Sequence, residues 1–161
     1  MKLGNLEVTT KHVRYHQGHE GIGLNCNIYV DGVKTAAFYD AADGGEGTIR
    51  EIFNQEKFSL LKEEIGRQPD VEYKEEPGLF EAFSVKYDIE YMVNACAEEV
   101  ERKRMENLFK TALVWGVPGG TSYQFLKFKN PLASVPKDQI KLIISTRIKL
   151  KPGEEILNTN L

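Results

Sequence analysis

The chain has 161 residues, of which 41% are hydrophobic and 28% are charged, and its formal net charge is −3. This length and balance predict one globular domain over residues 1–161 with a core of ordinary size. The small net charge gives no global sign of a nucleic-acid or membrane binder. No apolar run approaches the roughly 18 residues that a membrane helix needs, and residues 1–10 carry no secretory signal. We therefore expect a cytoplasmic protein without a membrane partner.

Three strands are predicted over the first forty residues. Apolar and polar residues alternate over 22–30, which indicates a strand with one buried face. The Asp31-Gly32 pair is the preferred two-residue hairpin turn, and residues 33–39 return as the partner strand. Residues 6–16 also alternate and precede the hairpin. Together these segments predict a three-stranded antiparallel meander.

Two helical regions are predicted after the meander. Residues 48–51 match a capping box, in which a hydroxyl and a carboxylate close the first turn of a helix. A helix through about residues 58–65 then ends at a glycine. Residues 88–115 repeat apolar side chains at helical spacing and are also followed by a glycine. These patterns predict two helices joined by an acidic, irregular connection.

The end of the chain is predicted to return to strands, over residues 123–129 and 140–151. The second segment alternates strictly, with a basic second face. The order β-β-β-α-α-β-β then fits an α+β domain with a mostly antiparallel sheet and helices packed on one face.

The three histidines fall within eight residues of one another, and carboxylates follow at the end of the third predicted strand. The candidate ligand-binding residues of this cluster are His12, Arg14, His16, His19 and Glu20. Zinc accepts nitrogen and oxygen ligands, and the candidate metal ligands are His16, His19, Asp40 and Asp43. Their spacing matches no metal motif, and Arg14 disfavours a cation nearby. A hydrogen-bonded polar sheet face, a divalent metal site and an anion contact therefore stay open.

A glycine-rich turn precedes the first predicted helix and includes Gly44, Gly45 and Thr48. Such a turn at a helix start can cradle phosphate with backbone N–H groups. It is not a P-loop, because no Gly-Lys-Ser/Thr follows, and Asp43 and Glu46 would repel an anion. The alternative is a tight connection whose glycines adopt positive φ.

Charge is uneven along the chain. Residues 70–101 contain ten acidic and two basic residues, whereas residues 121–151 contain seven basic residues and one acidic residue. The candidate partner-binding residues of the basic segment are Lys141, Arg147, Lys149 and Lys151. This basic face fits an anionic partner, either protein or single-stranded nucleic acid. The alternative is that it faces the acidic segment of the same chain.

Cys26 and Cys96 lie on the apolar stripes of a predicted strand and a predicted helix. They are far apart in the sequence and match no catalytic or metal-binding motif. We expect both to be buried, reduced thiols, as in proteins of a reducing compartment.

Residues 28–45 contain a strand, an Asp-Gly turn, a second strand and the sequence Ala-Asp-Gly-Gly. This pattern resembles one in small uncharacterised proteins of phages and mobile elements. The resemblance implies a small accessory protein that acts by binding.

The sequence contains no complete catalytic motif. Our leading hypothesis is a non-enzymatic binding or assembly protein without a cofactor, which engages a protein or nucleic-acid partner or associates with itself as a homo-oligomer. One alternative is a metal-dependent hydrolase that uses a divalent metal at the cluster of histidines and carboxylates. Another is a binder of a small nucleotide or phosphate at the glycine-rich turn.

Overall fold

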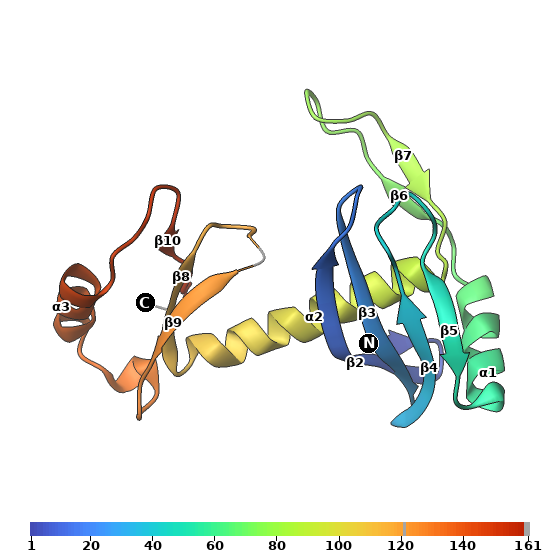
Figure 1. Cartoon of the computed structure of the whole chain (residues 1–161), viewed down its shortest axis with the longest axis horizontal. Helices are drawn as coiled ribbons and strands as arrows, with labels where there is room; N and C mark the ends of the chain where they lie inside the picture. Colours follow the sequence, from blue (N-terminus) through green and yellow to red (C-terminus); the bar gives the residue numbers. More distant parts are fainter. Residues whose placement is uncertain (121, 160–161) are drawn as a thin grey trace. The chain divides into compact units, whose positions relative to one another are not determined.

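The computed structural model describes residues 1–120 and 122–159, and its fold class is α+β with mostly antiparallel sheets, as predicted (Figure 1). The chain groups into two compact units, Met1–Val100 (unit 1) and Glu101–Leu161 (unit 2). The single domain expected from the length stays a prediction. Within the described residues, none of the helices combines the length and apolar composition that a bilayer crossing requires.

Unit 1 is built on a five-stranded antiparallel sheet in the order β1-β2-β3-β4-β5. The strands are β1 (Lys2–Leu3), β2 (Leu6–Gln17), β3 (Ile22–Val30), β4 (Val33–Tyr39) and β5 (Thr48–Ile52). The predicted meander of β2, β3 and β4 is confirmed. Asp31 and Gly32 both adopt positive φ, 49° and 78°, as the predicted turn requires. The Asp31 carboxylate accepts hydrogen bonds from the Glu7 backbone N–H at 2.9 Å and from Lys57 Nζ at 2.7 Å, which ties the turn to β2 and to the first helix.

The first helix begins later than the capping-box pattern predicts. Residues 48–52 form strand β5, where Ile49 pairs with Phe38 and packs against the core. Helix α1 (Gln55–Gly66) starts after Asn54, whose side chain accepts a hydrogen bond from the Lys57 backbone N–H at 2.9 Å. The predicted helix start at residue 48 is wrong, because cross-strand pairing with β4 decides the conformation of this segment.

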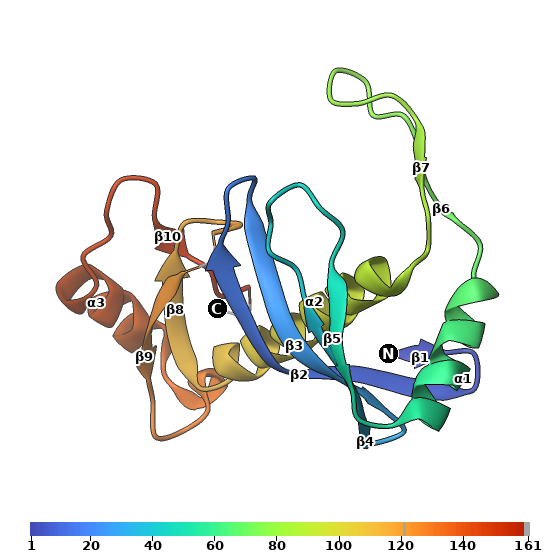
Figure 2. The same ribbon diagram turned by 45° about the vertical axis from the view of Figure 1, so that its right-hand side comes forward.

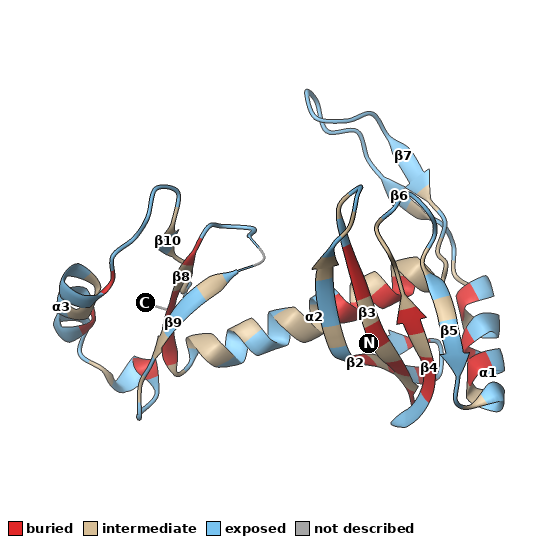
Figure 3. Cartoon of the chain, viewed as in Figure 1, coloured by how far each residue is buried: buried red, intermediate tan, exposed pale blue. Residues whose placement is uncertain are grey.

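One face of the sheet is covered by α1 and by the first half of α2 (Ile89–Phe109), which runs behind the strands in Figures 1 and 2. Apolar side chains of both helices and of the strands form one core (Figure 3). Its least exposed large side chains are Val8, Ile28, Val30, Phe38, Leu61, Met92 and Val93. Helices on one face of the sheet were predicted, and in unit 1 this prediction is confirmed.

A hairpin arm joins α1 to α2. It is formed by β6 (Val71–Tyr73) and β7 (Phe83–Val85), which pair antiparallel, with a further bridge between Glu76 and Phe80 near the tip. Figures 1 and 2 both show the tip of this arm extending away from the five-stranded sheet. Its residues are almost entirely solvent-exposed (Figure 3).

Unit 2 contains a second, three-stranded antiparallel sheet in the order β10-β8-β9. The strands are β8 (Ala112–Gly116), β9 (Tyr123–Lys127) and β10 (Glu155–Ile156). The predicted strand from residue 123 is confirmed, whereas residues 112–115 are a strand and not the end of the long helix. Ala112, Leu113 and Val114 are fully buried, as expected for the central strand of a sheet.

The predicted strand over residues 140–151 is wrong. The 3₁₀ turn η1 (Leu132–Ser134) is followed by helix α3 (Lys137–Arg147). Ile140, Ile144 and Ile148 recur every four residues, so the segment that alternates like a strand also fits one helical face. That face packs on the small core of unit 2, around Leu113 and Leu132.

Candidate functional site

The centre of β2 contains a β-bulge that breaks the predicted alternation. Thr10 still points into the core and is 2% exposed. His12 then adopts a φ of 57°, and the pairing with β3 shifts its register between Lys11 and Arg14. Because the bulge inserts an extra residue, Val13 packs against the core while Arg14 lies on the opposite face. Uninterrupted alternation over residues 6–16 would put Thr10, Arg14 and His16 on one face of the strand, and the bulge instead separates Thr10 in the core from Arg14 on the outer face.

His16 is part of the outer face of the sheet, the face opposite the helices. Its ring stacks on Tyr39, with centroids 5.4 Å apart and an interplanar angle of 10°. His16 Nε2 and Asn25 Oδ1 are shielded from solvent and have no hydrogen-bond partner among the described residues. The guanidinium of Arg50 lies 3.8 Å from the centre of the same Tyr39 ring. His16 and Arg50 thus both contact the Tyr39 ring.

The carboxylates of the candidate metal set stabilise turns. Asp40 Oδ1 accepts a hydrogen bond at 2.8 Å and Asp43 Oδ1 accepts one at 3.4 Å, each from the backbone N–H two residues further on. His19 and Glu20 are exposed in the loop between β2 and β3. Over residues 1–120 and 122–159, no three His, Cys, Asp or Glu side chains gather closely enough to hold a metal ion. The geometry therefore lends no support to the hydrolase alternative.

The glycine-rich turn is occupied by carboxylates of the chain itself. The Gly47 backbone N–H donates a hydrogen bond to Glu90 Oε2 at 2.7 Å. Gly44 has a φ of 85°, and a Cβ placed on it would lie 2.5 Å from Glu20 Oε2. Gly45 follows in the same turn, and Thr48 opens strand β5. The predicted helix N-terminus is therefore absent at this turn, and with it the partial positive charge that the phosphate interpretation required.

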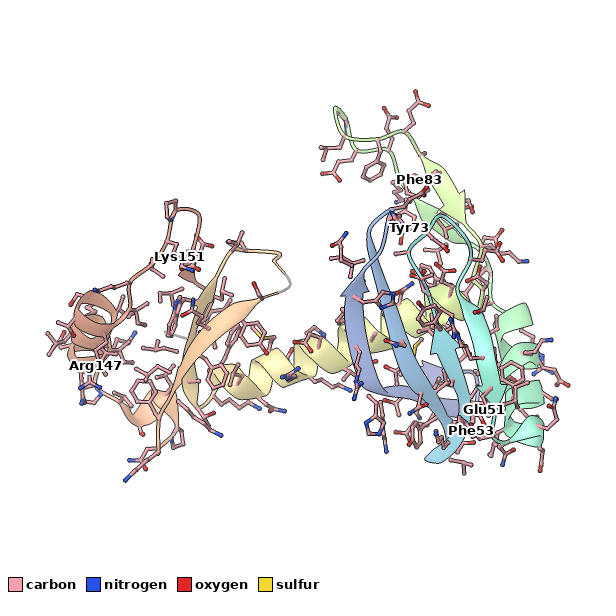
Figure 4. The ribbon with its side chains drawn as sticks, in the orientation of Figure 1. Glu51, Phe53, Tyr73, Phe83, Arg147 and Lys151 are labelled. Carbon is pink, nitrogen blue, oxygen red and sulfur yellow. The ribbon has the colours of Figure 1, made fainter. Side chains whose placement is uncertain are left out.

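The basic residues of the C-terminal segment are exposed but do not form one strand face. Lys141 and Arg147 lie in α3, where a separation of six residues turns the side chains by about 240° around the helix axis. Lys149 and Lys151 follow the helix and are also exposed. Figure 4 labels Arg147 and Lys151 on this part of unit 2. The prediction of a single basic strand face is wrong, because the segment is helical.

The outer face of the sheet carries three cation–π contacts that the sequence analysis missed. A cation lies within 4.3 Å of a ring centre in each pair, and the pairs are Lys11 on Tyr29, Lys34 on Phe53 and Arg50 on Tyr39. All three cations are exposed. The sequence does indicate that two of these rings lie on the outer face, because Tyr29 and Tyr39 occupy the polar positions in the alternation of their strands. The contacts themselves depend on cross-strand register, which the sequence does not specify at the bulges.

The hairpin arm exposes large apolar side chains. Tyr73 and Phe83 stack with centroids 4.8 Å apart, and Phe80 packs edge-on to Phe83 at 5.5 Å. Leu79 at the tip is 74% exposed, the highest value among the large hydrophobic side chains described. Figure 4 shows Tyr73 and Phe83 side by side on the arm. A cluster of this kind on an extended hairpin is typical of a surface that another molecule covers.

The described residues form a surface hollow in each unit. The hollow of unit 1 has a volume of about 420 Å³ and lies between α1, β5 and the start of α2, with Lys62 and Lys86 in its lining. The hollow of unit 2, which we call the basic hollow, has a volume of about 270 Å³. It is lined by Arg104, Asn107, Leu108, Thr111, Tyr123, Phe125 and Lys127.

Cys26 and Cys96 are free thiols and both are buried, so the prediction of their burial is confirmed. Burial, with a smaller effect of Cys96, raises the pKa of the Cys26 thiol to about 12. Burial also raises the pKa of the Cys96 thiol to about 11. Both thiols are therefore protonated at neutral pH, which makes them poor nucleophiles and metal ligands.

No family model, curated protein or solved structure matches the chain. The resemblance of residues 28–45 to phage and mobile-element proteins and the cytoplasmic location stay predictions.

Proposed function

We propose that this chain is a non-enzymatic binding protein that assembles with itself through the hairpin arm. The observation that carries the proposal is the exposure of Tyr73, Leu79, Phe80 and Phe83 on the arm, at 38%, 74%, 40% and 47%. A two-stranded hairpin is marginally stable in water by itself, and exposed rings add a hydrophobic penalty. A partner that covers the arm removes that penalty.

The charge of the arm defines the kind of partner. Residues 72–81 contain four glutamates and one lysine, so the rings and Leu79 are surrounded by negative charge. An apolar surface with an acidic rim requires a partner with an apolar centre and a basic rim, because unpaired like charges at an interface are unfavourable.

The basic hollow of unit 2 has this complementary chemistry. Arg104 and Lys127 contribute positive charge, and no carboxylate is among the residues that line the hollow, although Arg104 Nη1 also lies 3.5 Å from Glu101 Oε2. Phe125 supplies an apolar wall that is 52% exposed. The occupant that we propose for the hollow is the tip of the arm from a second copy of the chain. Arm and hollow are different surfaces, so the interface is heterologous and assembles copies head to tail.

A matched pair of leucine variants tests this proposal. Leu79→Asp places a charge at the tip of the arm, whereas Leu142→Asp makes the same change at a leucine of α3 that is 60% exposed and lies outside the hollow. We expect the wild type and Leu142→Asp to form concentration-dependent oligomers in analytical ultracentrifugation, and Leu79→Asp to stay monomeric. A monomeric wild type up to about 100 µM contradicts the proposal, because it places the dissociation constant above that range.

Mixing two defective variants tests the head-to-tail geometry. Leu79→Asp retains an intact hollow and Phe125→Asp retains an intact arm, so each alone has half an interface. In an equimolar mixture they should form a one-to-one dimer that grows no further. Oligomers larger than a dimer, or no complex at all, would contradict the pairing of arm and hollow. Circular dichroism of both variants checks that each is folded.

A further inference from the structure

The outer face of the five-stranded sheet is basic although unit 1 as a whole is acidic. Unit 1 contains ten basic and nineteen acidic residues. The second half of β2 and the whole of β3, β4 and β5 cover residues 11–17, 22–30, 33–39 and 48–52. Within these segments, Glu51 is the one carboxylate. The same segments contain Lys11, Arg14, Lys34 and Arg50. Glu7, at an exposed position in the first half of β2, is the other carboxylate of strands β2 to β5. Four cations against two carboxylates leave these strands with a positive balance in an acidic unit.

Aromatic rings are interleaved with these cations. Lys11 Nζ lies 4.3 Å from the centre of the Tyr29 ring, and Lys34 Nζ lies 3.6 Å from the centre of the Phe53 ring. Phe53 itself is 41% exposed, and Figure 4 labels it next to Glu51 at one end of β5. Lys11, Lys34 and Arg50 are nevertheless exposed, so their charges are accessible to an anionic ligand.

We infer that this outer face binds single-stranded nucleic acid. Phosphates would pair with Lys11, Lys34 and Arg50, and unpaired bases would stack on the accessible parts of the rings, as on other sheet surfaces that bind single strands. Four strands spaced by about 4.8 Å span roughly 15 Å, which is room for a few nucleotides. Asn25 and Asn27 lie on the same face, at the β2 pairing positions of Arg14 and Lys11, and bring amide groups that hydrogen-bond to base edges.

A duplex fits this surface less well. Strands β2 to β5 present a sheet surface and not a helix that could enter a groove, and stacking requires bases that are not already stacked in a helix. The inference also does not depend on assembly, because the arm and the basic hollow contribute none of the residues that it uses.

Fluorescence anisotropy with a labelled oligothymidylate of about 12 nucleotides tests the inference on the full chain. We expect wild type to bind at about 50 mM salt and Lys34→Glu/Arg50→Glu to bind at least about tenfold more weakly. Loss of two phosphate contacts should also reduce the slope of log affinity against log salt by about 1.4. Lys149→Glu/Lys151→Glu makes the same change of charge in unit 2 and should leave the affinity and the slope unchanged.

Glu51 supplies a test in the opposite direction. Removing the one carboxylate of these segments in Glu51→Gln should strengthen oligonucleotide binding and steepen its salt dependence, since repulsion of phosphate is lost. The variant Lys34→Met/Arg50→Met removes the same charges as the reversal without adding new ones. It should also bind more weakly while its circular dichroism spectrum matches the wild type, which excludes misfolding as the cause.

Several outcomes would overturn the inference. These are no binding by the wild type at 50 mM salt, equal losses in the unit 1 and unit 2 double variants, or a duplex of the same length that binds as tightly as the single strand. Leu79→Asp separates this inference from self-assembly. Its oligonucleotide affinity should equal that of the wild type, even if the oligomer is lost.

Discussion

The two units of the chain differ in charge and in the size of their cores. Unit 1 has ten basic and nineteen acidic residues, whereas unit 2 has eleven basic and five acidic residues. Among the described residues, the core cluster of unit 1 contains sixteen buried side chains and that of unit 2 contains four. Since hydrophobic burial is the main stabilising contribution to folding, unit 1 can depend on its own core to a degree that unit 2 cannot.

The surface of unit 2 agrees with this difference. Phe125 and Leu142 are 52% and 60% exposed in a unit that is only 61 residues long, a size at which domains are often marginal. A partner that binds the folded form stabilises it by mass action. From this difference we expect the proposed assembly, where it forms, to stabilise unit 2 more than unit 1.

Phe38→Ala should have the largest effect. Phe38 is 1% exposed, and its ring fills the space beside Gly47. Removing a buried phenylalanine side chain leaves a cavity and costs about 3–5 kcal/mol of stability. Urea denaturation followed by far-UV circular dichroism measures this loss. Val117→Ala, at a side chain of unit 2 that is 51% exposed, is the control and should change stability by less than about 0.5 kcal/mol.

The order of unfolding tests the comparison directly. Trp115 is the single tryptophan and packs against the core of unit 2, so its fluorescence reports on this unit alone. We expect its transition to precede the far-UV circular dichroism transition by about 1 M urea, at a protein concentration where the chain is monomeric. Coincident transitions at all concentrations would show that the two units unfold together and that the difference in core size has no energetic consequence.

Most of unit 1 was predictable because its local signals agree with one another. The alternation of β3, the Asp31-Gly32 turn and the return strand all favour the same hairpin, and the structure contains it. The errors lie where one segment satisfies two patterns. Residues 140–148 fit both a period of two and a helical period, and tertiary packing on Leu113 selects the helix.

The candidate site was less predictable than the fold. The side chain of His16 lies where the bulge at His12 directs it, and no local pattern in β2 indicates that bulge. The cations over aromatic rings come from residues on different strands or beyond them, so they form only once the register is set. The exposed arm was predicted only as an irregular connection, because two three-residue strands are too short to produce a periodic signal.

Alkaline pH should destabilise unit 1 by less than Phe38→Ala does. The folded-state pKa values of Cys26 and Cys96, about 12 and about 11, are above the ordinary value of 9.0. The stabilisation is therefore fully present below pH 9 and is lost as pH rises through these values, since only the unfolded thiols ionise readily. Urea midpoints from circular dichroism should fall between pH 8 and pH 10, and Cys26→Ala/Cys96→Ala should reduce that dependence. An identical pH dependence in the double variant would refute this account.

The helix starts of the two units give the smallest expected effect. Asn54 Oδ1 caps α1 by accepting the Lys57 backbone N–H at 2.9 Å, whereas α3 follows Pro136 without a side-chain cap. Asn54→Ala leaves that N–H without its protein acceptor and should cost unit 1 about 1 kcal/mol. Asn54→Asp keeps an acceptor and should be close to wild type.

At α3, Pro136→Asp adds a capping carboxylate but removes the restriction that proline places on the unfolded chain. The gain of about 0.5–2 kcal/mol and the loss of about 0.4–1 kcal/mol largely offset each other, so the Trp115 transition should shift little. A large stabilisation by Pro136→Asp would mean that the missing helix cap, and not the small core, limits the stability of unit 2. The difference in stability between the two units would then come from local structure at a helix start.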